Sequence, residues 1–172
     1  NGQTYFAVQT RRQELTDEQI EEEKRLSIRE ELKTHNIRLM GTVKGAGIIL
    51  SKDYAIFQNH GYQGLYGGLT AQDIHAKKGL KSGQTILDHM GSTELAANLF
   101  RATQTEEKIK RERITGKENA NHAHYEVGRK VRKTIEDLGG TPPEDLPAAE
   151  SLKTIGSKRK KALAKKKEIA DS

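Results

Sequence analysis

The side chains with the clearest chemical meaning in this chain are the cations near its C-terminal end. Residues 151–172 hold 8 basic and 2 acidic side chains, whereas residues 1–150 hold 22 of each, so this tail supplies the whole formal net charge of +6. Such a segment can neutralise phosphates and bind nucleic acid in a salt-dependent way. It is equally typical of a solvated end, and both readings stay open. The cations that would contact nucleic acid or an acidic partner are Lys158, Arg159, Lys160, Lys161, Lys165, Lys166 and Lys167.

A second basic group consists of Lys77, Lys78 and Lys81, between two short segments of helical pattern. This arrangement suggests a helix-turn-helix that would contact nucleic acid. The register fits poorly, because Ala76 at the usual small position leaves Leu80 where the turn glycine should stand. The alternative is a helical hairpin whose lysine-bearing turn is solvated.

Aromatic side chains gather among the glycines of the central segment, at Tyr54, Phe57, Tyr62 and Tyr66. Aromatic rings can stack on the bases of single-stranded nucleic acid. Only 33% of the chain is hydrophobic, and Trp is absent, so the rings are also needed in a core. We expect core packing, and keep as an alternative that Tyr62 and Tyr66 face a partner.

Catalytic and metal-binding patterns are weak. The glycine-rich run 41–47 is followed by Ile48, whereas a phosphate-binding P-loop needs Lys and then Ser or Thr after its last glycine. His122 and His124 lie two residues apart on a predicted helix and therefore point to different faces, and cysteine is absent. We thus predict no catalytic residue, cofactor or metal site, although a metal-dependent nuclease built from some of the 24 carboxylates stays a third alternative.

The elements that must position these side chains are predicted to be mostly α-helical. We expect an N-terminal helical arm over about 1–36, with a break near His35 and Asn36. A glycine-rich segment over about 41–68 follows, which we interpret as a turn, a short helix or strand and an ordered loop. Short helices should follow at 70–78 and 84–89. A helical hairpin of 92–114 and 117–138 completes the pattern.

The second hairpin helix has the best apolar stripe, with Val127, Val131, Ile135 and Leu138 at steps of four and three. It should pack against the first hairpin helix, either of the same chain or of a second copy. The second arrangement would make a homo-oligomer. We expect one helical domain over 1–150 and a disordered basic tail over 151–172.

The compartment is suggested by what the sequence lacks. Cysteine is absent, which fits a reducing cytoplasm, and the longest apolar run is too short to span a bilayer. The chain begins with Asn rather than Met, so we expect a fragment or a processed product.

Four blocks, residues 3–11, 61–68, 77–91 and 142–150, resemble the DNA damage-inducible protein D family. They occur in order along nearly the whole chain. Members of that family are longer, with an N-terminal antirepressor-like region, so the chain resembles their C-terminal part. The resemblance implies a bacterial protein of the SOS response connected with recombinase filaments of RecA type on single-stranded DNA.

Three functions follow as hypotheses. The first is a non-catalytic accessory protein that binds a recombinase filament or its single-stranded DNA and modulates it. The second is an antirepressor-type, sequence-specific DNA-binding regulator. The third is the metal-dependent nuclease.

Overall fold

The protein is all-helical throughout the residues that the structure describes. A computed structural model describes the backbone of residues 2–172 and the side chains of residues 16–172. No strand occurs among these residues, which confirms the predicted mostly α fold. The elements are α1 (Gly2–Gly45), α2 (Ser51–Leu65), α3 (Ala71–Lys77), η1 (Ile86–His89), α4 (Ser92–Arg111), α5 (Lys117–Asp137), η2 (Pro143–Asp145) and α6 (Leu152–Asp171).

Helix α1 is one continuous helix of 44 residues, about 66 Å long. The predicted break near His35 and Asn36 is therefore wrong. No Gly or Pro occurs between positions 3 and 40, and Leu32, Leu39 and Val43 are fully buried on one face across the expected break. Tertiary packing of this face thus stabilises a continuous helix, which ends at Gly45.

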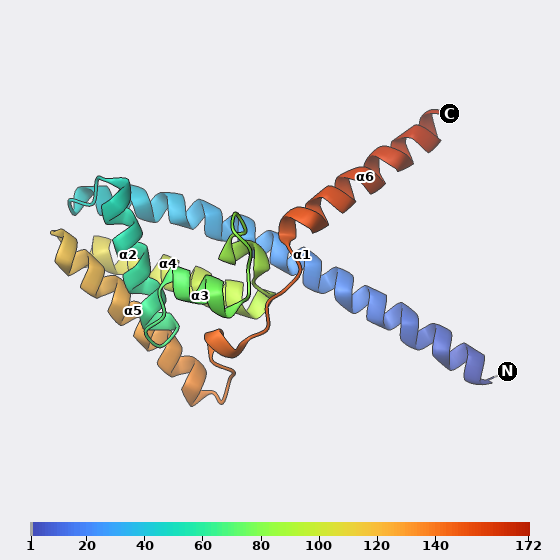
Figure 1. Ribbon diagram of the computed structural model, residues 1–172, viewed down its shortest axis with the longest axis horizontal. Coiled ribbons are helices and arrows are strands. Elements are labelled where there is room, and N and C mark those ends of the chain that lie inside the picture. The colour runs from blue at the N-terminus through green and yellow to red at the C-terminus, as the bar shows by residue number, and fades with distance from the viewer. Residues whose placement is uncertain (1) are drawn as a thin grey trace.

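The body of the molecule consists of two packed helix pairs. Helix α2 packs along α5, and α1 packs along α4, while α4 and α5 form the predicted hairpin (Figure 1). The N-terminal part of α1 and most of α6 project from this body and diverge from each other (Figure 1). Among the described residues, none of the helices combines the length and the hydropathy that a membrane span requires.

The glycine-rich segment 41–68 contains the end of α1 and the whole of α2, where a turn, a short element and a loop were predicted. Gly61 and Gly64 lie inside this helix and are buried. A Cβ added to Gly61 would overlap the His124 ring, and one on Gly64 would lie under 3.0 Å from the Tyr125 carbonyl oxygen. Gly128 on α5 faces them in the same way, since a Cβ added to it would lie 2.7 Å from the Gly61 carbonyl oxygen. The glycines therefore serve backbone-to-backbone packing of two helices rather than a loop.

The apolar stripe of α5 is mostly used inside the chain. Val127 and Val131 are buried, and Ile135 packs against the core from its edge. Leu138 alone of the four is open to solvent, at 81% exposure. The same-chain alternative is therefore the one observed for Val127 and Val131, and they do not form a free surface for a second copy.

A buried Arg101 and His124 lie together where α2, α4 and α5 meet. Both side chains are fully buried. The Nδ1 atom of His124 lies 2.8 Å from the Phe57 carbonyl oxygen, so Nδ1 carries the proton, and Nε2 accepts from Arg101 Nη1. Asn98 Oδ1 and the Tyr62 ring, whose centroid is 5.0 Å from Arg101 Cζ, complete the environment of the guanidinium. Among described residues no carboxylate pairs with it.

This pair makes stability depend on pH in a definite direction. Burial and the adjacent guanidinium hold the pKa of His124 well below its usual value. Below about pH 6.5 the unfolded chain therefore binds a proton that the folded chain does not, and the free energy of unfolding should fall by up to about 1.4 kcal/mol per pH unit from this group. We expect His124→Gln to flatten that slope in urea unfolding between pH 7.5 and 5.5. The exposed His122→Gln serves as control, and equal slopes in both variants would contradict the assignment.

Helix α6 occupies the segment for which we predicted a disordered tail. Leu152 and Ile155 in its first turn are buried and anchor the helix to the body. Beyond them, Lys and Ala dominate, and both residue types have good helix propensity. The predicted basic character holds, but it is displayed on a helical arm.

Candidate nucleic-acid interface

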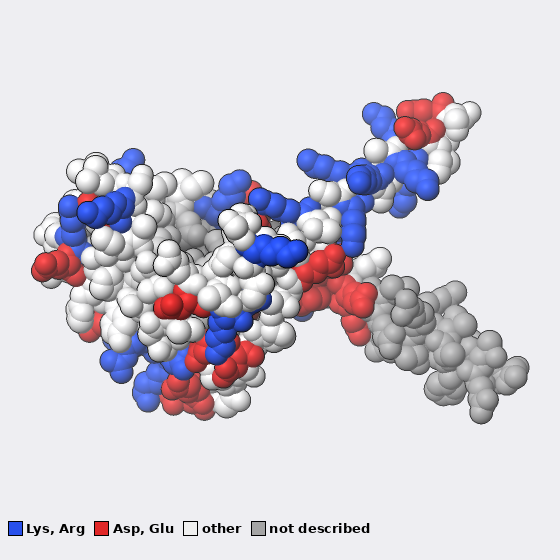
Figure 2. All heavy atoms as spheres, viewed as in Figure 1, with Lys and Arg blue, Asp and Glu red and all other residues white. Residues whose placement is uncertain are grey.

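The predicted basic residues of the tail form an exposed cationic arm. Every residue from position 160 to 172 is exposed. Blue atoms extend along α6 on the visible face in Figure 2. Within the described part of the chain, no ion pair involves Lys160, Lys161 or Lys165–Lys167, so their charges are free for an external anion. We call residues 158–167 of α6 the basic arm.

The base of this arm is held by two ion pairs with the body. Lys158 Nζ lies 3.0 Å from Glu150 Oε1, and Arg159 Nη2 lies 3.4 Å from Glu22 Oε2. All four side chains are substantially exposed, so the pairs orient the first turns of α6 more than they stabilise the fold. Of the predicted contact residues in the tail, these two cations are thus partly engaged already.

The direction of α6 is set by the segment that precedes it, residues 142–150, which we call the strap. The backbones of Ala149 and His89 are joined by a 2.9 Å hydrogen bond from Ala149 N to His89 O, and His89 Nδ1 lies 2.9 Å from Ala149 O. At the other end, Glu144 accepts two hydrogen bonds of 2.7 Å from Arg132 on α5. These contacts fix the strap against η1 and α5.

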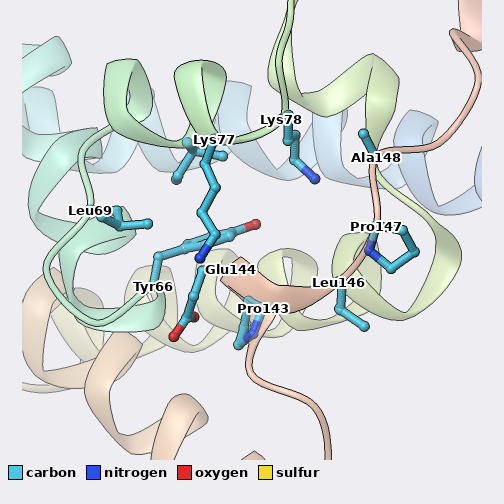
Figure 3. Close-up of a pocket in the computed structure, with 10 residues that line it drawn as sticks. Tyr66, Leu69, Lys77, Lys78, Pro143, Glu144, Leu146, Pro147 and Ala148 are labelled. Atoms are coloured by element: carbon cyan, nitrogen blue, oxygen red, sulfur yellow. The ribbon is translucent and has the colours of Figure 1, made fainter.

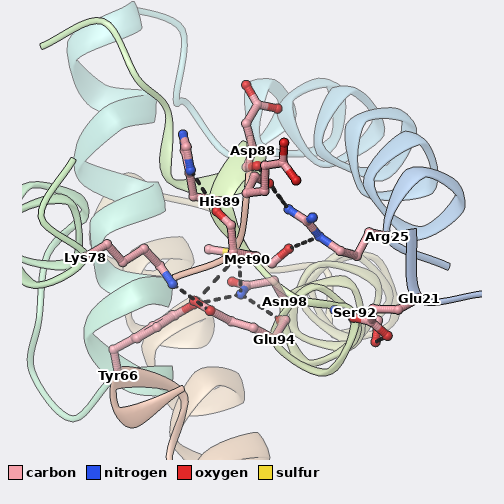
Figure 4. A network of polar contacts seen from close by, with 12 residues as sticks. Glu21, Arg25, Tyr66, Lys78, Asp88, His89, Met90, Ser92, Glu94 and Asn98 are labelled. Carbon is pink, nitrogen blue, oxygen red and sulfur yellow. Dashed lines mark hydrogen bonds and ion pairs between the residues drawn. The ribbon is translucent and has the colours of Figure 1, made fainter. Parts of the chain in front are cut away.

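Arg25 on α1 connects the strap to the rest of the body. Its side chain is 4% exposed and donates to three backbone carbonyls, those of Met90 at 2.8 Å, Asp88 at 3.2 Å and Glu150 at 2.6 Å (Figure 4). One guanidinium therefore joins α1, the turn before α4 and the last residue of the strap. We call this set of contacts the Arg25 clamp.

An acidic stretch of α1 lies beside the base of the basic arm. Its members are Asp17, Glu18, Glu21, Glu22 and Glu23. Figure 2 shows acidic atoms where α1 leaves the body, next to the blue atoms of α6. Glu21 also accepts from the Ser92 backbone N–H at 3.0 Å and from its hydroxyl at 2.7 Å, and thereby caps α4. The two projecting helices thus carry opposite charge where they diverge.

The second predicted basic group is not assembled as a single surface. Lys78 Nζ is buried and bonds Glu94 Oε1 at 2.7 Å, which removes it as a nucleic-acid contact. Lys77 forms an exposed pair with Asp145 at 3.3 Å, and Lys81 is exposed. Helix α3 is followed by a loop and the four-residue η1, so no recognition helix of a helix-turn-helix follows it in the described chain.

The predicted partner-facing aromatics are buried, so that alternative is wrong. Tyr62 is 7% and Tyr66 1% exposed. The Tyr66 hydroxyl donates to Glu94 Oε2 and accepts from Asn98 Nδ2 at 3.0 Å (Figure 4). Burial first, and then the nearby Glu94 carboxylate, raise the pKa of Tyr66 well above its usual value, which keeps its proton in place. The core duty expected for these rings is what the structure shows.

Two buried charged residues that organise the structure around this site escaped the sequence analysis. Arg25 stands within a run of alternating charges, where nothing distinguishes it from its neighbours. Glu94 has the pattern of an exposed acid in the first turn of α4, yet it is 1% exposed. Among the described residues, no group of three or more His, Asp or Glu side chains is placed to hold a metal ion.

The fold and this site together define an all-helical domain that presents a cationic helical arm from a clamped base. Residues 19–155 match the family pattern described as the DinD C-terminal domain, and the chain belongs to this family. Over 160 residues it is 61% identical to the DNA damage-inducible protein D of Escherichia coli strain K12. The aligned region covers 90% of this chain and 58% of that protein. The chain therefore spans less than two thirds of its relative, and it belongs to a family linked by name to the DNA-damage response.

Proposed function

We propose that this chain is an accessory module of the bacterial SOS response that binds a recombinase filament, its single-stranded DNA, or both, without catalysing a reaction. The observation that carries the proposal is the basic arm, whose unpaired lysines stand on an exposed helix. The family relationship supplies the link to DNA damage. The site of action would be the cytoplasm, where that DNA is found.

The geometry of the arm suits a flexible polyanion. Helix α6 has 20 residues and is about 30 Å long. Its lysines at positions 158, 161 and 165 share one face, while those at 160 and 167 lie on another. A charged rod of this type can contact phosphates from several directions and carries no base-reading pattern, so we propose binding that is independent of sequence.

The diverging arms also suit a filament of protein and DNA. The basic arm can contact the phosphate backbone, while the acidic stretch of α1 is repelled by it and is available to basic side chains of a protein. Two arms of opposite charge would then prefer a protein-coated strand to a bare one.

The proposal predicts a defined loss of binding when the arm is neutralised. We expect replacement of Lys165, Lys166 and Lys167 by Gln to weaken binding to fluorescent single-stranded DNA and to lower the slope of log affinity against log salt by up to about 2, since each phosphate contact on a single strand contributes about 0.7. The measurement is fluorescence anisotropy over a salt series, with and without an assembled recombinase filament.

A matched control carries the same charge change elsewhere. Lys33, Lys44 and Lys52 are exposed on α1 and α2, and their replacement by Gln should leave the slope nearly unchanged. Equal losses in the two triple variants would mean that only net charge matters. Absence of binding to both strand and filament would contradict the proposed function of this domain.

A further inference from the structure

A pocket lies between α3 and the strap. It has a volume of about 180 Å³. Its apolar wall comes from Leu69, Ile74, Pro143, Leu146 and Pro147, and Figure 3 shows the Lys77 and Lys78 side chains extending from α3 towards it. Small-molecule sites are usually larger than about 300 Å³, whereas a cavity of about 150 Å³ holds a benzene ring. The pocket is therefore sized for one apolar side chain.

The inner end of the pocket has unused hydrogen-bond donors. Lys78 is only 6% exposed, and Glu94 Oε1, at 2.7 Å, is its one partner within the described chain. An ammonium group has three N–H donors. Two of them remain for a group that enters the pocket beside the apolar wall.

Lys77 at the mouth supplies a positive charge that can be redirected. Its ion pair with Asp145 is 3.3 Å long, and both side chains are about half exposed. An exposed pair of this kind contributes little to stability and exchanges readily. An incoming carboxylate can therefore compete with Asp145 for Lys77.

The carboxylates around the pocket are already neutralised by other groups. Glu144 lines the pocket but accepts two hydrogen bonds from Arg132. These bonds lower the pKa of Glu144 and outweigh the opposing effect of its partial burial, so its charge is already paired. Glu94 is bonded by Lys78 and by the Tyr66 hydroxyl. What an entering group meets is thus an apolar wall and two lysines rather than negative charge.

We propose that this pocket binds an extended segment of a partner protein in which a Leu-sized apolar side chain stands next to a carboxylate. The apolar side chain occupies the space between Ile74 and Leu146, and the carboxylate bonds Lys77 at the mouth with Lys78 donors behind it. This site goes beyond the proposed function and involves none of the lysines of the basic arm.

The probe for this site is the blocked peptide acetyl-Gly-Leu-Asp-Gly-amide, titrated into the full chain while the methyl NMR signals of Leu69, Ile74 and Leu146 are followed. We expect saturable shifts at low millimolar concentration. The isosteric peptide with Asn in place of Asp should bind up to about five-fold more weakly. The peptide with Ala in place of Leu should bind more weakly still, by about ten-fold or more, because it loses three carbons of the buried side chain.

Two substitutions should change the affinity in opposite directions. Lys77→Met should weaken binding of the Asp peptide about three- to five-fold, and Asp145→Asn should strengthen it by a similar factor because Lys77 is released. Lys81→Met, which removes a neighbouring exposed charge outside the pocket, is the control and should have no effect.

The proposal is overturned if the Asp and Asn peptides bind equally, if the Lys77 and Lys81 variants behave alike, or if no methyl shift appears up to about 10 mM. Folding of each variant is checked from its unperturbed methyl spectrum. Because the readout contains no DNA, its failure is distinguishable from failure of the proposed function, which is tested on the lysines of the arm.

Discussion

Replacing Gly64 by Ala is expected to lower the free energy of unfolding by about 3 kcal/mol, since overpacking at a well-packed contact costs about 1–3 kcal/mol and occasionally more. The added Cβ would overlap the Tyr125 carbonyl oxygen and lie 3.0 Å from the Arg129 backbone nitrogen. These are backbone atoms of α5, so no side-chain rotation relieves the overlap. The two helices must separate, which opens the packing around Phe57 and Val127. Urea unfolding monitored by circular dichroism measures the loss.

The chain offers a control in which the same change should have the opposite sign. Gly41 is exposed within α1, and a Cβ there meets nothing within 4 Å. Gly41→Ala should therefore stabilise by up to about 1 kcal/mol, the difference in helix propensity. If both variants moved stability in the same direction, close packing of α2 on α5 would not be the reason for the glycine at position 64.

The second large effect is expected at the Arg25 clamp. Arg25→Met keeps much of the side-chain volume but removes the donors to the Met90, Asp88 and Glu150 carbonyls. Hydrogen bonds to charged groups contribute about 1.5–3 kcal/mol each when one partner is lost, and the effects in one cluster are not additive, so we expect a loss of about 3 kcal/mol. We also expect faster amide hydrogen exchange in the strap and the first turn of α6, because the clamp holds their backbone.

Arg38→Met is the matched control for the clamp. Arg38 is an exposed arginine on the same helix, and its removal changes the net charge equally. Its stability should stay within about 0.5 kcal/mol of the parent. Uniform faster exchange across the whole domain in Arg25→Met, with no preference for the strap, would contradict the positioning role of the clamp.

The elements that the sequence predicted well are those set by local signals. The short helix expected at 70–78 begins at a capping box, in which Thr70 and Asp73, three residues apart, make both reciprocal hydrogen bonds. The hairpin of α4 and α5 agrees with the prediction within a few residues at each end. In both cases, the deciding residues are neighbours along the chain, so composition and spacing carry the information.

The features that were missed depend on contacts between distant residues. Gly61 and Gly64 have the composition of a loop, and only their encounter with Gly128, more than 60 positions later, makes them part of a helix. Lys78 and Glu94 are likewise residue types that usually lie on the surface. Their side chains can be buried because they form an ion pair with each other. One signal in the sequence could have indicated this packing. Gly61 and Gly64 are three positions apart, and Gly128 lies within the apolar stripe of the helix that they contact.

The Arg25 clamp also has a consequence for the order in which the protein can fold during synthesis. Arg25 leaves the ribosome before its carbonyl partners, which lie at positions 88, 90 and 150, as much as 125 residues later. At about 5–20 residues per second, the last of them follows roughly 6–25 seconds afterwards. Throughout that interval α1 can form as a helix, yet a buried arginine has no complete set of acceptors. The set of contacts that Arg25 makes is therefore completed only after the strap has been synthesised.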